Sequence, residues 1–211
     1  GFLVKNVDGS IQSTDMENEV GTVPPPPTVI EASVPDGLQD GINLDPNDAT
    51  KATLVIYAPN KNYIYFLSSF NNWTIDSNFL LKKDTPKNRF WIELNGLTPQ
   101  TDYTYQYLID GSLRVADPYS TLILSESNDQ FIDNITYPDL PAYPTGKTNH
   151  AVTVLRTGDA PYNWQITNFK RPEKTDLVIY EVLLRDFDEL HSFNALKDRL
   201  DYLQKLGVNA I

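Results

Sequence analysis

The chain has 211 residues, of which 40% are hydrophobic, and its 17 basic and 28 acidic side chains give a net charge of −11. This length leaves room for one sizeable domain and part of another, and the acidic balance excludes nucleic acid and anionic membranes as expected partners. Cysteine is absent, which excludes disulfides and thiolate metal sites, and no apolar stretch is long enough to span a bilayer.

The first 48 residues predict no complete domain. Residues 1–22 open with the strand-like run FLVKNV and the turn pair Asp8-Gly9, which indicates the tail of a preceding β domain. Residues 23–48 contain VPPPPTV and are then polar and rich in turn residues. They are predicted to form a stiff, proline-rich linker.

Residues 49–135 are a succession of short strand patterns. The runs are TLVIYAP, YIYFLSSF, RFWIEL, YTYQYLID and SLRVAD, and the last two are separated by the hairpin pair Asp110-Gly111. This spacing predicts an antiparallel β-sandwich. Tyr103, Tyr105 and Tyr107 recur at period two and predict an aromatic core stripe, whereas Trp91 is out of phase with Phe90 and should face away from the main apolar set.

Two further segments follow. Residues 136–175 hold five prolines without periodicity and are predicted to be an extended connector. In 176–211, the run LVIYEVLL predicts a strand covered on both faces, and a helix with Ser192 as N-cap and Gly207 after its end should follow. Its apolar stripe is Phe193, Leu196, Leu200, Leu203 and Leu206. The pattern is a βαβ unit cut short after Val208–Ile211.

Several of these stretches resemble a known family. "VIYAPNKNYIYFLSSFNNWT" and "YTYQYLIDGSLRVADPYS" resemble the immunoglobulin-like domain, related to glycogen-binding modules, that precedes the catalytic barrel in many bacterial glycoside hydrolase family 13 enzymes of the α-amylase and pullulanase type. "LVIYEVLLRDF" and "LDYLQKLGVNAI" look like the opening of that family's (β/α)₈ barrel. The expected fold is therefore mainly β, an immunoglobulin-like antiparallel sandwich followed by an incomplete βαβ start of a TIM barrel.

The resemblance implies a role without catalysis for these residues. The family cleaves α-glucosidic bonds with an Asp nucleophile and a Glu acid/base at the ends of later barrel strands, beyond Ile211. We assign no catalytic residue and expect the 211-residue chain to be inactive, although its parent polypeptide would be a hydrolase. Asp186, Asp188 and Glu181 follow or interrupt the predicted strand, but we interpret the first two as loop residues and Glu181 as a paired group inside the barrel.

Glycan binding by the sandwich is the second hypothesis. Trp73, flanked by Asn72, corresponds to a sugar-stacking tryptophan of the glycogen-binding relatives, and Trp91 is a candidate second platform. Two matching positions depart from the family, because Gln106 stands for a lysine and Leu113 for a second tryptophan. The alternatives are that Trp73 packs between the sandwich and its neighbour, and that Trp91 covers the outer sheet face or contacts the barrel.

The remaining expectations complete this interpretation. The third hypothesis is an interaction module whose uncovered βα segment docks on a partner, packs on the sandwich or self-associates with another copy. His150 and His191 are expected to be ordinary loop residues, and neither a metal site nor a cofactor is predicted. The expected ligand of the parent enzyme is an α-glucan of the starch or glycogen type, and its expected location, by family analogy, is extracellular, periplasmic or on the bacterial cell surface.

Overall fold

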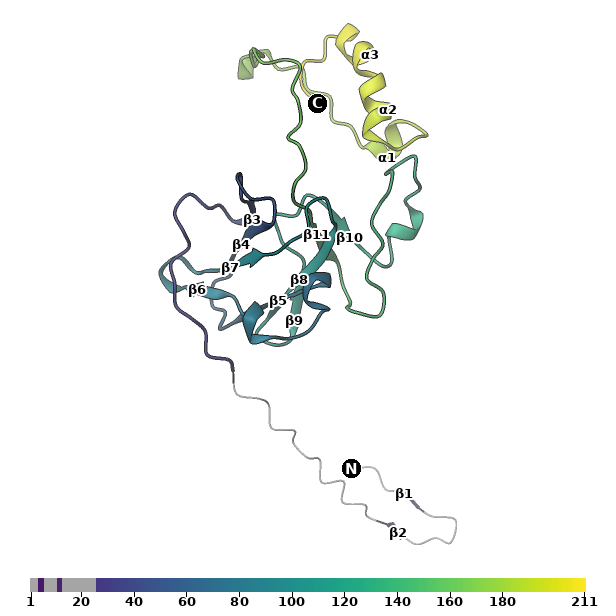
Figure 1. Cartoon of the computed structure of the whole chain (residues 1–211). Coiled ribbons are helices and arrows are strands. Elements are labelled where there is room, and N and C mark those ends of the chain that lie inside the picture. The colour runs from purple at the N-terminus through teal and green to yellow at the C-terminus, as the bar shows by residue number, and fades with distance from the viewer. Residues whose placement is uncertain (1–3, 6–10, 13–25) are drawn as a thin grey trace.

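The computed structural model describes residues 4–5, 11–12 and 26–211, and its main body is two antiparallel sheets packed face to face (Figure 1). One sheet has the order β3 (Gly41–Leu44), β4 (Lys51–Tyr57), β7 (Arg89–Asn95), β6 (Lys82–Asp84). The other has the order β10 (Ile123–Leu124), β11 (Val152–Leu155), β8 (Tyr103–Ile109), β5 (Ile64–Ser68), and β9 (Leu113–Val115) also pairs with β8. The prediction of a mainly β, antiparallel fold is confirmed.

The core between the sheets follows the alternation seen in the sequence. Leu54 and Phe90 point inward from the four-stranded sheet, and Phe66, Tyr105 and Tyr107 point inward from the five-stranded sheet. All five are fully buried. Burying an aromatic side chain removes a large apolar area from water, so these residues provide much of the driving force for sheet packing.

The five predicted strand runs all form strands, as β4, β5, β7, β8 and β9. Asp110 and Gly111 lie between β8 and β9 with φ of 49° and 75°. Two successive positive φ values are those of the tight hairpin turn that matches the twist of its strands. The hairpin prediction is therefore confirmed.

The sandwich extends beyond the predicted limits of 49–135 at both ends. β3 lies within the segment predicted to be a linker, and β11 lies within the predicted connector. Both strands are four residues long and depend on a longer neighbour, β4 for β3 and β8 for β11. Strands this short carry too few alternating residues to be recognised without that partner.

Each sheet is also covered on its outer face. Residues 30–34 cross the four-stranded sheet, where Glu31 makes a parallel bridge to Lys83 and Val34 packs against Val55 and Trp91. Part of the connector covers the five-stranded sheet, where Leu140 and Tyr143 pack against a buried cluster of Leu124, Val152 and Val154. Parts of the predicted linker and of the predicted extended connector thus cover the sheets.

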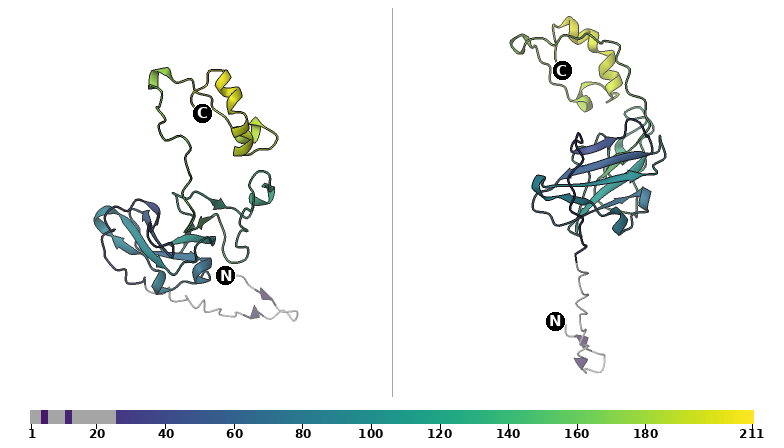
Figure 2. Two further views of the ribbon diagram at one scale, coloured as in Figure 1. Left: turned by 45° about the horizontal axis from the view of Figure 1, so that its top comes forward. Right: turned by 60° about the vertical axis from the view of Figure 1, so that its left-hand side comes forward.

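The C-terminal segment lies apart from the sandwich and is joined to it by one extended stretch of chain (Figures 1 and 2). It contains α1 (Leu184–Phe187), α2 (Phe193–Asp198) and α3 (Leu200–Lys205). Ser192 caps α2 by accepting a hydrogen bond from the Ala195 amide, and Gly207 has a φ of +85°, as predicted.

The predicted strand at 177–184 and the continuous helix are not formed. The helix is interrupted at Arg199, and the strand is reduced to one parallel bridge between Ile179 and Ala210. Most of the predicted stripe is exposed, with Phe193 79% accessible, whereas Leu203 is buried. A parallel strand needs neighbours on its edges and cover on its faces, and the described residues supply only Ala210 and short helices. The barrel start remains a prediction.

Outside these units, β1 (Val4–Lys5) and β2 (Ile11–Gln12) pair antiparallel. The rest of the predicted tail at 1–22 lies outside the described residues. Among the residues that are described, none of the helices has the length and apolar character needed to cross a membrane.

Candidate functional site

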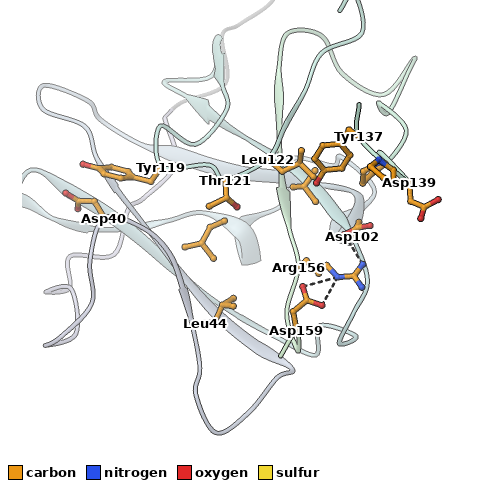
Figure 3. A pocket seen from close by; sticks show the side chains of 14 residues that line it. Asp40, Leu44, Asp102, Tyr119, Thr121, Leu122, Tyr137, Asp139, Arg156 and Asp159 are labelled. Atoms are coloured by element: carbon orange, nitrogen blue, oxygen red, sulfur yellow. Dashed lines mark hydrogen bonds and ion pairs between the residues drawn. The ribbon is translucent and has the colours of Figure 1, made fainter. Parts of the chain in front are cut away.

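An open cleft of about 840 Å³ lies at the edge of the sandwich (Figure 3). It lies where β3 of one sheet approaches the β10 and β11 side of the other, and residues 137–141 of the connector form one wall. Its lining residues are Asp40, Ile42, Leu44, Asp102, Tyr119, Thr121, Leu122, Tyr137, Pro138, Asp139, Pro141, Val154, Arg156 and Asp159. Ligand sites in proteins are commonly clefts of this size with mixed apolar and polar walls.

Arg156 is the only basic side chain in the cleft lining, and two lining carboxylates hold it in place. Its Nε donates to both carboxylate oxygens of Asp159, at 2.9 and 3.0 Å, and its Nη1 donates to Asp102 at 3.2 Å. These hydrogen bonds, first those to Asp159 and then that to Asp102, raise the pKa of Arg156. The guanidinium is thus fixed in orientation, while Nη2 donates no hydrogen bond within the described part of the chain.

Asp40, at the far end of the cleft lining, is also paired. Its carboxylate lies 2.6 Å from Nε of Arg89, and a second contact to Nη2 measures 3.1 Å. The hydrogen bonding of the Arg89 guanidinium to the Asp40 carboxylate, which accepts, raises the pKa of Arg89. Three of the four lining aspartates therefore have an arginine partner, and Asp139 is the fourth.

Tyr119 is positioned by a buried carboxylate behind the cleft. Asp117 is 1% exposed and accepts hydrogen bonds from the hydroxyls of Tyr105 and Tyr107 at 2.8 and 3.0 Å. Its other oxygen accepts from the Tyr119 amide at 2.8 Å. The core of the five-stranded sheet thereby fixes the backbone from which the Tyr119 ring extends.

A glycine allows the same ring to approach the sheet edge. Gly41 opens β3 with a φ of +97°, and a Cβ placed there would lie 2.5 Å from Cβ of Tyr119. Only glycine accommodates both this backbone conformation and this approach. The cleft is therefore built from well-packed parts of the sandwich.

Trp73 and Asn72, the predicted sugar platform, lie elsewhere. Asn72 and Trp73 have φ values of 54° and 60°, and the Trp73 amide donates to the Ser68 carbonyl at 2.8 Å. The Trp73 side chain is half-buried and packs against the Leu124 cluster on the outer face of the five-stranded sheet, whereas Asn72 is exposed. Trp73 thus packs on its own sandwich, whereas the alternative that the sequence left open placed it between the sandwich and its neighbour.

Gln106 on β8 is covered by part of the connector. Its Nε2 donates to the carbonyls of Asn149 and Ala151, both at 2.7 Å, and its Oε1 accepts from the Thr148 hydroxyl. The side chain is fully buried. Residues 148–151 thus cover the Gln106 side chain, while Leu113 is 48% exposed.

Trp91, the candidate second platform, is buried beneath residues 30–34. It is 7% exposed, its Nε1 donates to the Ala32 carbonyl at 3.0 Å, and Nζ of Lys82 lies 4.2 Å from its ring centroid. The prediction that Trp91 faces away from the main core is correct. Trp91 therefore covers the outer sheet face, which is one of the alternatives that the sequence left open for it.

The acidic candidates near the C-terminus do not converge on one site. Asp186 pairs with its neighbour Arg185, whose hydrogen bond lowers the pKa of Asp186. Asp188 accepts from the Leu190 amide, which lowers its pKa, and also from Arg199. Glu181 is exposed, not enclosed as expected. The part of the chain that the structure describes contains no group of three or more His, Asp or Glu residues placed to hold a metal ion.

The sequence did not predict the cleft. Tyr119 lies within a stretch quoted for its family resemblance, but nothing in the sequence indicated that it lines the same cleft as Tyr137 and Arg156. Arg156 follows β11, a strand that was not predicted, and its partner Asp102 is 54 positions away. Trp164 was also missed, although it is 73% exposed and stacks edge-on with Tyr162 in the extended stretch before the helices.

No protein-family model matches the chain, and no curated protein matches it. The solved structures that it resembles include pullulanases. Apo pullulanase from Klebsiella pneumoniae is 15% identical, with a TM-score of 0.33 over 42% of this chain and 10% of that one. Apo pullulanase from Paenibacillus barengoltzii is 18% identical, with a TM-score of 0.40 over 72% of this chain and 20% of that one.

A further structure of the Paenibacillus barengoltzii enzyme is a complex with maltohexaose and alpha-cyclodextrin, again 18% identical, with a TM-score of 0.39. The chain covers 10% and 20% of the length of the Klebsiella and Paenibacillus pullulanases, respectively. All these likenesses are partial and concern the fold.

Proposed function

We propose that this chain is the non-catalytic front part of an α-glucan-degrading glycoside hydrolase, in which the sandwich is an accessory domain beside a catalytic barrel. The observation that carries the proposal is the order of parts along one chain. A sandwich with the quoted sequence resemblance is followed by a segment in which Ile179 pairs in parallel with Ala210 across α1 to α3. Parallel pairing across helices is the connection from which α/β barrels are built.

The exposed apolar side chains of the C-terminal segment support the same proposal. Ile179 is 67% exposed and Phe193 79%, and Leu183, Tyr202 and Leu206 are also exposed. Apolar surface of this extent is normally covered by protein. Further βα units packed on both sides of the Ile179 bridge would cover it.

The substrate of the parent polypeptide would be an α-glucan of the starch or glycogen type. We further propose that the protein acts outside the cytoplasm, where such polymers are degraded by secreted or surface-bound enzymes. Both points rest on the family resemblance of the quoted stretches.

The two alternatives have less support. A starch- or glycogen-binding module built on Trp73 and Asn72 would need the neighbouring sheet face, and residues 148–151 cover Gln106 there. A stand-alone interaction module would use the same exposed apolar residues around Phe193. In that alternative a partner covers these residues, whereas in the main proposal further βα units cover them.

Hydrolysis assays test the proposal. The reading frame that encodes this chain should continue into a polypeptide that releases reducing ends from pullulan or starch, whereas residues 1–211 alone should release none. Activity in the 211-residue chain would contradict the proposal, and so would a reading frame that yields no α-glucan hydrolase.

A further inference from the structure

We propose that Lys170 is a processing site, at which a trypsin-like serine endopeptidase separates the sandwich from the C-terminal segment. This inference goes beyond the proposed function and does not depend on it. The site lies in the extended stretch that joins the two parts of the chain (Figures 1 and 2). Three features of that stretch carry the inference, namely its exposure, its unbonded backbone and the position of its basic side chains.

The backbone of the stretch is available to an enzyme. Residues 158–171 are all exposed, and within the described chain no hydrogen bond joins a backbone group of residues 158–172 to another backbone group. An enzyme that holds its substrate as an extended strand needs such unbonded N–H and C=O groups. Cleavage inside a packed sheet has to wait for local unfolding, whereas no structure has to open here.

Lys170 is the residue after which such an enzyme would cut. The acidic specificity pocket of trypsin-like enzymes takes a Lys or Arg side chain. Residues 160–169 carry no charge, and Lys170 and Arg171 follow them directly. Neither of these two residues is in an ion pair within the part of the chain that the structure describes, so either side chain can enter the pocket.

The neighbouring basic residues are less suitable. Arg171 precedes Pro172, whose fixed ring and missing N–H make it a poor fit on the far side of the bond to be cut. Arg156 is held in two ion pairs, and Lys174 lies in a 3-10 helix. The bond after Lys170 is therefore the one expected to break.

The reaction consumes one water molecule. The serine of the enzyme attacks the Lys170 carbonyl carbon, the bond to the Arg171 nitrogen breaks, and that nitrogen leaves as an amine after taking up a proton. Water then releases Lys170 with a free carboxylate. Both sheets stay in one product, because the strand β11 ends at Leu155 and Thr157 is the last buried residue before the stretch.

The experiment is limited digestion of the folded 211-residue chain with trypsin, followed by intact-mass measurement of the products. The first cut within residues 26–211 should fall after Lys170. Bonds after basic residues of the strands, such as Lys51 and Arg89, should be cut at least about a hundredfold more slowly, because the sheets must open first. A first cut inside the sandwich, or after Lys174, would overturn the inference.

Variants at exposed positions test the choice of bond. Lys170→Gln should slow cleavage after residues 170 and 171 at least about a hundredfold, because an acidic pocket rejects an uncharged side chain and Pro172 still protects Arg171. Adding Pro172→Ala to Lys170→Gln should restore cleavage, now after Arg171. The matched control Lys147→Gln, at an exposed lysine in a turn outside the stretch, should be cut like the wild type. Unchanged cleavage of the stretch in Lys170→Gln would also overturn the inference.

Discussion

The buried carboxylate of Asp117 joins the core of the five-stranded sheet to the backbone of Tyr119 at the sandwich edge. Every group that contacts its carboxylate oxygens donates a hydrogen bond, namely the hydroxyls of Tyr105 and Tyr107 and the amide of Tyr119. In Asp117→Asn one oxygen becomes an NH₂ group that faces a donor, so at least one buried bond is lost. We expect the free energy of unfolding to fall by about 2–4 kcal/mol in urea titrations. The control Asp36→Asn, at an exposed aspartate, should change it little, and equal effects would contradict this account.

The same two tyrosines predict a stability loss at alkaline pH. Burial raises the pKa of Tyr105 and Tyr107 well above the ordinary value, and the charge of Asp117 adds to this effect. A raised pKa in the folded state means that the stabilisation is complete below pH of about 10 and declines above it, since only unfolded chains ionise there. The decline should approach about 1.4 kcal/mol per pH unit for each tyrosine.

Chemical denaturation between pH 9 and pH 12 measures this decline. Tyr107→Phe should be less stable at neutral pH but should show about half the alkaline slope of the wild type. Identical slopes for the two proteins would show that Tyr107 ionises normally while the chain is folded.

At the scale of the element, β3 is joined to the cleft through Gly41. Gly41→Ala should lower the free energy of unfolding by about 2–4 kcal/mol, because the added methyl group would meet Cβ of Tyr119 as well as straining the backbone. Gly37→Ala is the matched control, since Gly37 has a similar φ of +87° and nothing within 4 Å of the added carbon. Gly37→Ala should lower the free energy of unfolding by about 1 kcal/mol, which is the backbone strain alone. Thermal denaturation of both variants checks the difference, and equal losses would contradict it.

The cover formed by residues 30–34 gives a second prediction at this scale. Trp91→Ala leaves a cavity under that segment and should destabilise the chain by about 3–5 kcal/mol. Trp164→Ala, at a tryptophan that is 73% exposed, should stay within about 0.5 kcal/mol of the wild type. Hydrogen exchange at the Ala32 and Val34 amides should rise only in the first variant, since these amides bond to Lys83 and Asp84.

The sequence predicted those elements whose pattern is local. β4, β5, β7, β8 and β9 each contain enough alternating or β-branched residues to be recognised alone, and the pair Asp110-Gly111 fixes one hairpin. β3 and β11 depend on neighbours that are distant in sequence, so the sandwich was predicted too short. The cleft could not be predicted for the same reason. Its lining residues are distant in sequence and come to line one cleft only after both sheets have formed; they include Asp40, Tyr119, Tyr137 and Arg156.

The strand predicted at 177–184 is not formed, and the reason is the opposite one. LVIYEVLL has the composition of a strand that is covered on both faces, and composition alone cannot supply the cover. In the described residues Ile179 has one partner, Ala210, and the chain on either side of it is exposed. The apolar pattern of LVIYEVLL therefore suits a buried strand, but the described residues do not bury it.

At the scale of the whole molecule, a packed sandwich is joined by an extended stretch to a segment that carries much exposed apolar surface. The sandwich holds the buried cores and the cleft, whereas the C-terminal segment buries few apolar side chains, such as Ala195 and Leu203. This contrast is consistent with the role that we propose for the two parts of the chain.

The most direct test of that account is the hydrolysis of polymeric α-glucan by the longer polypeptide that we propose, with and without residues 26–157. The account predicts that the intact polypeptide is active, and that removing the sandwich lowers its thermal midpoint and its kcat/KM on the polymer while the catalytic carboxylates remain. Unchanged stability and unchanged activity after removal would contradict it.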